Sequence, residues 1–270
     1  MADNPRSDII QLGDDDGDLT PANPKRVRVK RMHQRWTVAS PRVEARVAGL
    51  LYLLVILLGG FAEIGVRQGL VITGDPAGTA RAIMAHQDLF REGFAAEMMT
   101  NVIAIPVTLI IYRLLAPAGP FLALLGVALD LTQNTVNAVN AWTQFAPLTL
   151  LGGSPDLAAV PQGELVALAR LTLKWHDVGF QIGLTFFGFA LLIEGYLIFR
   201  SGYFPRWLGA LYALAGACYL INSYVSFLAP DLPIFPYILY PCVIGEGALS
   251  LWLLIVGVKE TKWRAVAGET

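Results

Sequence analysis

The sequence predicts an all-α integral membrane protein, a bundle of six transmembrane helices with both termini in the cytoplasm. Three observations lead to this prediction. Of the 270 residues, 55% are apolar and only 15% are charged, whereas soluble domains carry about 25% charged residues. The charges are concentrated before residue 47. Beyond that point the chain contains apolar runs long enough to cross a hydrocarbon core, which takes about 20 helical residues.

Six apolar segments reach that length. We expect these segments to be helices, because lipid offers no partners for unpaired backbone groups. We place the spans at residues 47–70, 94–116, 120–147, 176–199, 206–229 and 234–258. Two further segments have helical patterns: residues 76–92 predict a short amphipathic helix on the outer face, and residues 164–175 predict an outward extension of the fourth span.

The charge pattern divides the chain into three parts. Residues 1–45 are acidic and then basic, and we expect a disordered cytoplasmic tail because blocks of like charge stay solvated. Residues 46–258 form the membrane domain, and residues 259–270 form a short cytoplasmic tail. With the N-terminus inside, 15 of the 20 Lys and Arg residues fall on the cytoplasmic side, in agreement with the positive-inside rule.

The composition also limits the partners. The net charge of −1 excludes a chain-wide polycation for nucleic acid, so the expected surroundings are the lipid bilayer together with a membrane protein partner or a second copy of the chain. The basic residues of the tail are expected either to contact anionic lipid, at about 1 kcal/mol per charge, or to act only as a topology signal. They include Lys25, Arg26, Arg28, Lys30 and Arg31.

Carboxylates within the spans are the informative positions, because a charge near the bilayer centre costs at least about 2.5–3.5 kcal/mol. Glu246 lies near the middle of the sixth span, and Asp130 lies about 15 Å from the start of the third. Glu194 is close enough to Arg200 that we expect it to reach toward the inner surface. Pro241 predicts a bend in the helix beside Glu246.

The third span carries a polar stripe at spacings of three and four residues, which places it on one helix face. Its members are Asp130, Gln133, Asn134, Asn137, Asn140 and Gln144. The stripe cannot face lipid. It either forms hydrogen bonds with other helices, worth about 0.6–2 kcal/mol each, or lines a wet cavity.

Other polar residues map to the outer third of the spans. Glu63 and Arg67 lie four residues apart, which predicts an ion pair on one helix. His176 and Asp177 are adjacent and must point in different directions. We interpret His176 as a hydrogen-bonded interface residue, with a ligand role as the alternative.

The sequence contains none of the common catalytic motifs that we considered. The sequence lacks HExxH, GxSxG, a P-loop and a dinucleotide-binding glycine motif, so we expect no metal and no cofactor and lean away from an enzyme. Gly179 and Gly183 form a GxxxG motif, which is typical of a close contact between helices.

Several short runs resemble the membrane family known as domain of unknown function 4386. They are Arg46–Leu54, Phe61–Glu63, Gly74–Asp75, Gly179–Gly188, Gly195–Tyr203 with Pro205, Leu208–Gly209, Leu214–Gly216, Gly245–Glu246 and Leu251–Leu254. The resemblance covers residues 44–258 and implies a multi-pass helical protein of the bacterial cytoplasmic membrane. It implies no catalytic role for any residue.

Two functions follow from these observations. The sequence favours a structural or accessory membrane subunit whose polar stripe packs against a partner. The alternative is a small-solute binding or transport protein that uses the intramembrane carboxylates, and an intramembrane enzyme has the least support. Candidate residues for a ligand or a coupling ion are Glu246, Asp130, Asn134, Asn137, Glu63 and His176.

Overall fold

The computed structural model describes residues 40–232 and 237–268, which lie in one of the chain's two units, Val38–Thr270. Within these ranges every regular element is a helix. Of the tail predicted over residues 1–45, residues 1–39, with the basic residues from Lys25 to Arg31, lie outside the described part of the chain. Residues 41–45 are not disordered but form the start of α1 (Pro41–Gly60), which is capped by Ser40.

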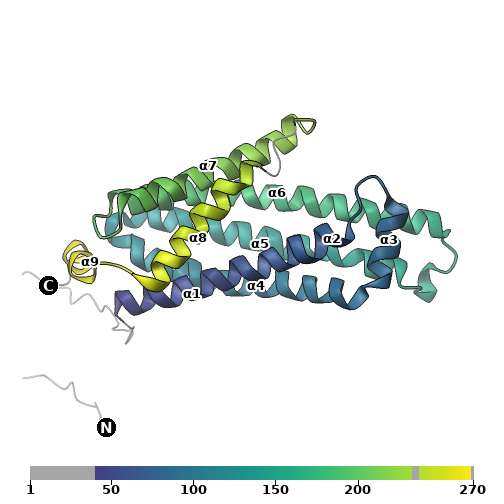
Figure 1. Ribbon diagram of the computed structural model, residues 1–270, viewed down its shortest axis with the longest axis horizontal. Coiled ribbons are helices and arrows are strands. Elements are labelled where there is room, and N and C mark those ends of the chain that lie inside the picture. Colours follow the sequence, from purple (N-terminus) through teal and green to yellow (C-terminus); the bar gives the residue numbers. More distant parts are fainter. Residues whose placement is uncertain (1–39, 233–236, 269–270) are drawn as a thin grey trace, which may run out of the picture. The chain divides into compact units, whose positions relative to one another are not determined.

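The described residues form six long helical segments (Figure 1). The first runs without a break through α1 (Pro41–Gly60), the π-helix η1 (Phe61–Arg67) and α2 (Gln68–Leu70). The other five are α4 (Gln87–Leu115), α5 (Pro120–Leu151), α6 (Gln162–Arg200), α7 (Arg206–Leu228) and α8 (Tyr240–Ile255). The short elements are α3 (Pro76–Ala85), η2 (Ala116–Ala118), η3 (Pro155–Leu157), η4 (Tyr237–Leu239) and α9 (Glu260–Ala267).

Five segments are long and apolar enough to cross a membrane, and they indicate a multi-pass membrane protein. They are Pro41–Leu70, Gln87–Ala118, Gln162–Arg200, Arg206–Leu228 and Tyr237–Ile255. The remaining predicted span coincides with α5, whose 32 residues are long enough to cross. The polar stripe interrupts the apolar run of α5, and by length and composition the other five segments are the candidate spans.

The first four long segments extend beyond the predicted spans, whereas α7 and α8 end before the predicted residues 229 and 258. α1 begins at Pro41, where the Val43 amide donates to the Ser40 hydroxyl at 3.4 Å. α6 begins at Gln162, so the predicted outward extension and the fourth span form one helix. The predicted amphipathic helix is divided at His86, between α3 and the start of α4. Hydropathy marks only the apolar length of a helix, whereas capped polar turns continue it.

One local prediction is wrong. α8 begins at Tyr240, so Pro241 occupies its first turn and does not bend the helix beside Glu246. A first-turn proline lacks an amide hydrogen that has no partner within the helix in any case, so it fits there without distortion.

The six segments pack in a closed ring. Each contacts the next in the order α1, α4, α5, α6, α7 and α8, and α8 in turn contacts α1. Successive segments run back and forth along the long axis of the picture, and α8 crosses the others obliquely (Figure 1). We name the two ends of the ring by the ends of its first segment: α1, α5 and α7 begin at the Pro41 end and run toward the Leu70 end.

Apolar side chains fill the Pro41 end of the ring. We call this set the apolar layer; it consists of Ile111, Leu114, Leu115, Leu197, Ile198, Leu208, Leu249 and Leu253. Two side chains donate to the Leu114 carbonyl at the end of α4: the Tyr203 hydroxyl at 2.7 Å and the Trp263 indole of α9 at 3.0 Å. These bonds satisfy a terminal carbonyl that has no partner within its own helix.

Candidate functional site

Three carboxyl groups lie inside the ring on three different helices. Asp130 belongs to α5, Glu194 to α6 and Glu246 to α8, and each residue is less than a tenth exposed. Tyrosines from α1 and α7 connect them. We call the whole set the acidic core; it consists of Asp130, Glu194, Glu246, Tyr52, Tyr212 and Tyr219.

Two tyrosines donate hydrogen bonds to Glu246. The Tyr52 hydroxyl donates to Glu246 Oε2 at 2.9 Å, and the Tyr219 hydroxyl donates to Oε1. Tyr52 is on α1 and Tyr219 is on α7, the two ring neighbours of α8. Both oxygens of this carboxyl group are therefore held by donors, an arrangement that suits its charged form.

The chain of polar contacts continues to the other two carboxyls. The hydroxyls of Tyr52 and Tyr212 lie 3.0 Å apart, and the Tyr212 hydroxyl contacts the Glu194 carboxyl. Glu194 in turn contacts Asp130, which accepts a hydrogen bond from the Thr108 hydroxyl at 3.4 Å. With Thr108 on α4, all six segments contribute a polar group to this chain.

A glycine makes room for the acidic pair. A Cβ atom built on Gly126, one turn before Asp130, would lie 3.4 Å from Glu194 Cγ and 3.5 Å from Glu194 Oε1. The Glu194 side chain therefore packs over the bare backbone of α5, which places its carboxyl beside that of Asp130.

No basic side chain balances these acids within the described part of the chain: none of its ion pairs includes Asp130, Glu194 or Glu246. Two carboxyl oxygens, Asp130 Oδ1 and Glu194 Oε2, are buried without a hydrogen-bond partner. No group of three or more His, Cys, Asp or Glu residues among those described could hold a metal ion. Carboxyl groups buried in this way bind protons or small cations in other membrane proteins.

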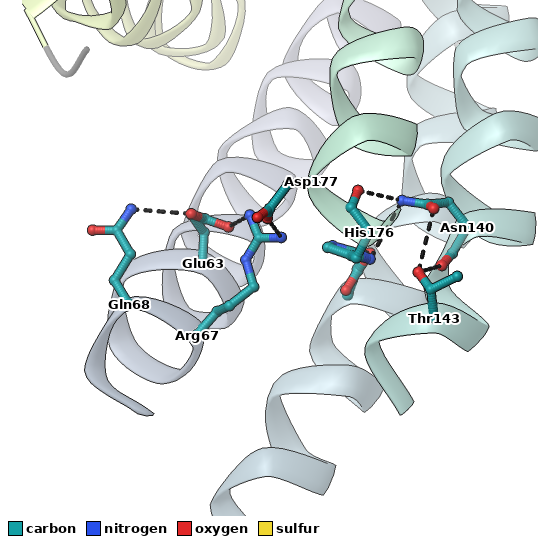
Figure 2. A network of polar contacts seen from close by, with 8 residues as sticks. Glu63, Arg67, Gln68, Asn140, Thr143, His176 and Asp177 are labelled. Carbon is teal, nitrogen blue, oxygen red and sulfur yellow. Dashed lines mark hydrogen bonds and ion pairs between the residues drawn. The ribbon is translucent and has the colours of Figure 1, made fainter. Parts of the chain in front are cut away.

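A second polar cluster lies toward the Leu70 end (Figure 2). Arg67, at the end of the π-helix, pairs with Glu63 on its own helix and with Asp177 Oδ1 of α6 at 3.1 Å. Gln68 Nε2 also donates to Glu63, at 3.0 Å. The predicted ion pair on one helix is confirmed, and the structure extends it to a second helix.

His176 occupies the buried side of the same region. Its Nε2 lies 3.8 Å from Glu97 Oε1 of α4, and its Nδ1 lies 3.3 Å from Asn140 Nδ2 of α5. The Asn140 amide also donates to the His176 carbonyl at 2.8 Å. His176 and Asp177 point to different partners (Figure 2), so adjacent residues on α6 join α4 and α5 on one side and α1 on the other.

The polar stripe of α5 faces α6 where the two helices approach closely. A Cβ on Gly179 would lie 2.7 Å from Asn140 Nδ2, and a Cβ on Gly183 would lie 3.2 Å from Asn137 Cγ. The GxxxG motif therefore makes a close helix contact, and the stripe supplies the side chains that occupy it. Asn134 and Asn137 are both buried.

The structure places the predicted candidates in two groups. Glu246 and Asp130 belong to the acidic core, whereas Glu63 and His176 belong to the cluster at the Leu70 end. Asn134 and Asn137 lie between them along α5. The predicted residues are therefore not brought together at one point.

The expected position of Glu194 is wrong. This residue is 2% exposed because its position on α6 faces into the ring, and Arg200 instead donates to the Tyr196 hydroxyl at 3.1 Å. The tyrosines of the acidic core were also missed. A tyrosine in an apolar run looks the same in sequence whether its hydroxyl bridges two acids or its ring fills a core, so the sequence offered no signal for them.

The fold and site define the class: a multi-pass helical membrane protein with acidic residues buried among its helices. Residues 47–257 match the family described as "Domain of unknown function (DUF4386)". The protein belongs to this family, as the resemblance in its sequence implied.

One similar protein comes from Archaeoglobus fulgidus and carries the name "Uncharacterized protein". The two are 37% identical over 91 residues, which is 32% of this chain and 54% of that relative. This chain therefore spans about half the length of the relative it matches. No solved structure matches the chain.

Proposed function

We propose that this protein is a membrane transport protein whose acidic core binds protons and passes them between carboxyl groups. One observation carries the proposal: Asp130, Glu194 and Glu246 are buried in one chain of polar contacts without a basic partner among the described residues. Unpaired charge is costly in hydrocarbon, and carboxyls buried in this way mark proton and ion pathways in membrane proteins.

The tyrosines supply a route between the carboxyls. Each phenol has one hydrogen to donate. Because Tyr52 donates to Glu246, the hydrogen between Tyr52 and Tyr212 must come from Tyr212. Tyr212 can then accept a proton from Glu194 when that carboxyl group is protonated. Moving each hydrogen one position along the chain transfers that proton from Glu194 to Glu246 and reverses the direction of every bond.

For the membrane topology we propose six spans, with α5 as the third and both termini in the cytoplasm. α5 need not be apolar on all sides, because its polar stripe faces the interior of the ring. Basic residues near the Pro41 end support a cytoplasmic position for that end. They are Arg42, Arg46, Arg113, Arg200, Arg206, Lys259, Lys262 and Arg264. We propose the bacterial cytoplasmic membrane as the location.

Proton flux into liposomes tests the proposal. Liposomes that contain the protein and a pH-sensitive dye are given a potassium diffusion potential with valinomycin, and internal pH is followed. We expect flux well above that of empty liposomes. In Glu246→Gln and in Glu194→Gln the flux should fall roughly tenfold, which corresponds to a barrier about 1.4 kcal/mol higher. Asp88→Asn, which changes an exposed acid, is the matched control. Flux equal to that of empty liposomes refutes the proposal.

A second candidate is an accessory membrane subunit with a partner protein or a second copy. The close fit of Asn137 and Asn140 against the α6 glycines favours this function, because it gives part of the stripe a purely structural role. Native mass spectrometry of protein extracted gently from its membrane separates the two. A stoichiometric partner retained in both wild type and Glu246→Gln supports a subunit, whereas protein extracted without any partner contradicts it.

A further inference from the structure

Three α5 side chains, spaced seven residues apart, each hold a buried polar atom that has no hydrogen-bond partner. These atoms are Asp130 Oδ1, Asn137 Oδ1 and Gln144 Nε2. Seven residues are close to two helical turns, so the three side chains lie on one face of α5. They span about 21 Å along the helix at 1.5 Å per residue. We call them the α5 file.

A fourth atom of the same kind, Glu194 Oε2, lies across from the file on α6. All four residues are less than a tenth exposed. Buried polar atoms in proteins almost always have a partner, and a hydrogen bond left unmade costs about 1–3 kcal/mol. Three acceptors and one donor in a line suit a partner that both donates and accepts, and water is such a partner.

We propose that the α5 file binds water and forms an access route by which protons reach the acidic core from the Leu70 end alone. The route rests on the proposed function and adds two things to it: the end of the ring from which protons reach the core, and the bound water through which they pass. The file ends at Asp130, which contacts Glu194 and belongs to the acidic core.

The two ends of the ring differ in a way that gives the route its direction. Toward the Pro41 end, the acidic core borders the apolar layer, whose Leu and Ile side chains are buried and offer no polar partner. Toward the Leu70 end, Asn140 lies one turn beyond Asn137 and contacts His176, which lies 3.8 Å from Glu97. From Asp130 toward the Leu70 end, buried polar side chains therefore continue along α5 as far as Gln144, whereas on the Pro41 side the core borders the apolar layer.

The close approach of α5 and α6 sets the width of the route. Asn137 packs against Gly183, and Asn140 packs against Gly179. A side chain at either glycine would meet these amides, so the helices touch where the file passes.

Cysteine accessibility tests the route without requiring transport. In the full chain with Cys218→Ala and Cys242→Ala, single variants are treated in sealed vesicles with a small cationic methanethiosulfonate that does not cross membranes. Asn137→Cys is compared with Val139→Cys, which is 65% exposed on the outer side of the same helix and faces lipid. Asp156→Cys marks the Leu70 end, and Lys262→Cys marks the opposite end.

We expect Asn137→Cys to react roughly tenfold faster than Val139→Cys, because a thiol needs water to ionise before it reacts. Labelling should occur only from the side that labels Asp156→Cys. Equal rates at the two α5 positions, or labelling from the Lys262→Cys side, overturn the proposal.

A second measurement uses the unmodified protein and does not depend on a variant folding. Hydroxyl radicals produced by X-rays label buried side chains that contact bound water. Tyr212 and Tyr203 are each 1% exposed, but Tyr212 belongs to the acidic core and Tyr203 packs among the apolar residues of the Pro41 end. We expect Tyr212 to be labelled several times faster, and equal or slower labelling overturns the route.

The results separate the route from the proposed function. Water access at Asn137 together with no proton flux in liposomes keeps the route and refutes proton transport. Flux that depends on Glu246, with Asn137→Cys no more reactive than Val139→Cys, keeps transport and refutes the route.

Discussion

The contact between α1 and α8 depends on Gly49, and adding one methyl group there should disturb the acidic core. A Cβ at this position would lie 2.7 Å from the Ser250 carbonyl oxygen and 2.8 Å from Leu254 Cα. Both are backbone atoms of α8, so no flexible side chain can move aside. The Leu254 amide nitrogen would lie closer still, so to reach an ordinary contact of 3.4 Å the helices must separate by at least about 0.7 Å.

Separating α1 from α8 would also disturb the acidic core, because the core contains residues of both helices. Tyr52 is one turn from Gly49 on α1, and Glu246 is one turn from Ser250 on α8. Their hydrogen bond of 2.9 Å would lengthen to about 3.6 Å, beyond bonding range. Overpacking costs about 1–3 kcal/mol and a lost bond to a charged group costs about 1.5–3 kcal/mol. We therefore expect Gly49→Ala to lower the free energy of unfolding by about 3–5 kcal/mol.

The matched control is Gly60→Ala at the other end of α1, where an added Cβ would meet no atom within 4 Å. Alanine favours a helix over glycine by about 1 kcal/mol, so this variant should be as stable as the wild type or slightly more stable. Reversible unfolding in mixed micelles with increasing SDS, followed by circular dichroism, measures both. If Gly49→Ala unfolds within about 0.5 kcal/mol of Gly60→Ala, the proposed coupling between helix contact and acidic core is refuted.

Three further variants test other contacts by the same unfolding measurement. Tyr203→Phe removes a donor to the Leu114 carbonyl and should lower stability by about 1 kcal/mol; an unchanged protein would show that the Trp263 bond suffices. Arg67→Gln removes the ion-pair partner of two carboxylates and should lower stability by about 1.5–3 kcal/mol. Its control is Arg81→Gln, whose exposed ion pair is 3.9 Å long; this change should lower stability by less than about 0.5 kcal/mol. Thr79→Ala removes the two hydrogen bonds that join α3 to the loop after the first span and should cost about 1–2 kcal/mol; loss below about 0.5 kcal/mol would mean that this loop does not depend on them.

Several residues that carry the family resemblance prove to be helix contacts. A Cβ on Gly195 would lie 2.6 Å from the Ala213 amide nitrogen, and a Cβ on Gly216 would lie 2.6 Å from the Gly188 carbonyl oxygen. Both contacts join α6 to α7. The glycines of these motifs lie where two helix backbones are in close contact. Gly245 lies at such a contact with α7, next to Glu246 of the acidic core.

The amino-acid sequence by itself determined the helices and their environment. Apolar runs of sufficient length specify membrane helices because lipid cannot satisfy an open backbone, and the i, i+4 spacing of Glu63 and Arg67 specifies their ion pair because it depends on one helix alone. The positions of Glu246 and Asp130 within apolar runs marked them as informative for the same reason.

Only the tertiary structure decided which polar groups meet. The contact between Glu194 and Asp130, and the bridge from Glu194 to Glu246 through Tyr212 and Tyr52, depend on how five helices are rotated about their axes and on the closure of the ring by α8 against α1. Helix rotation is set by packing between segments far apart in the chain, and hydropathy and spacing along one segment carry no information about it.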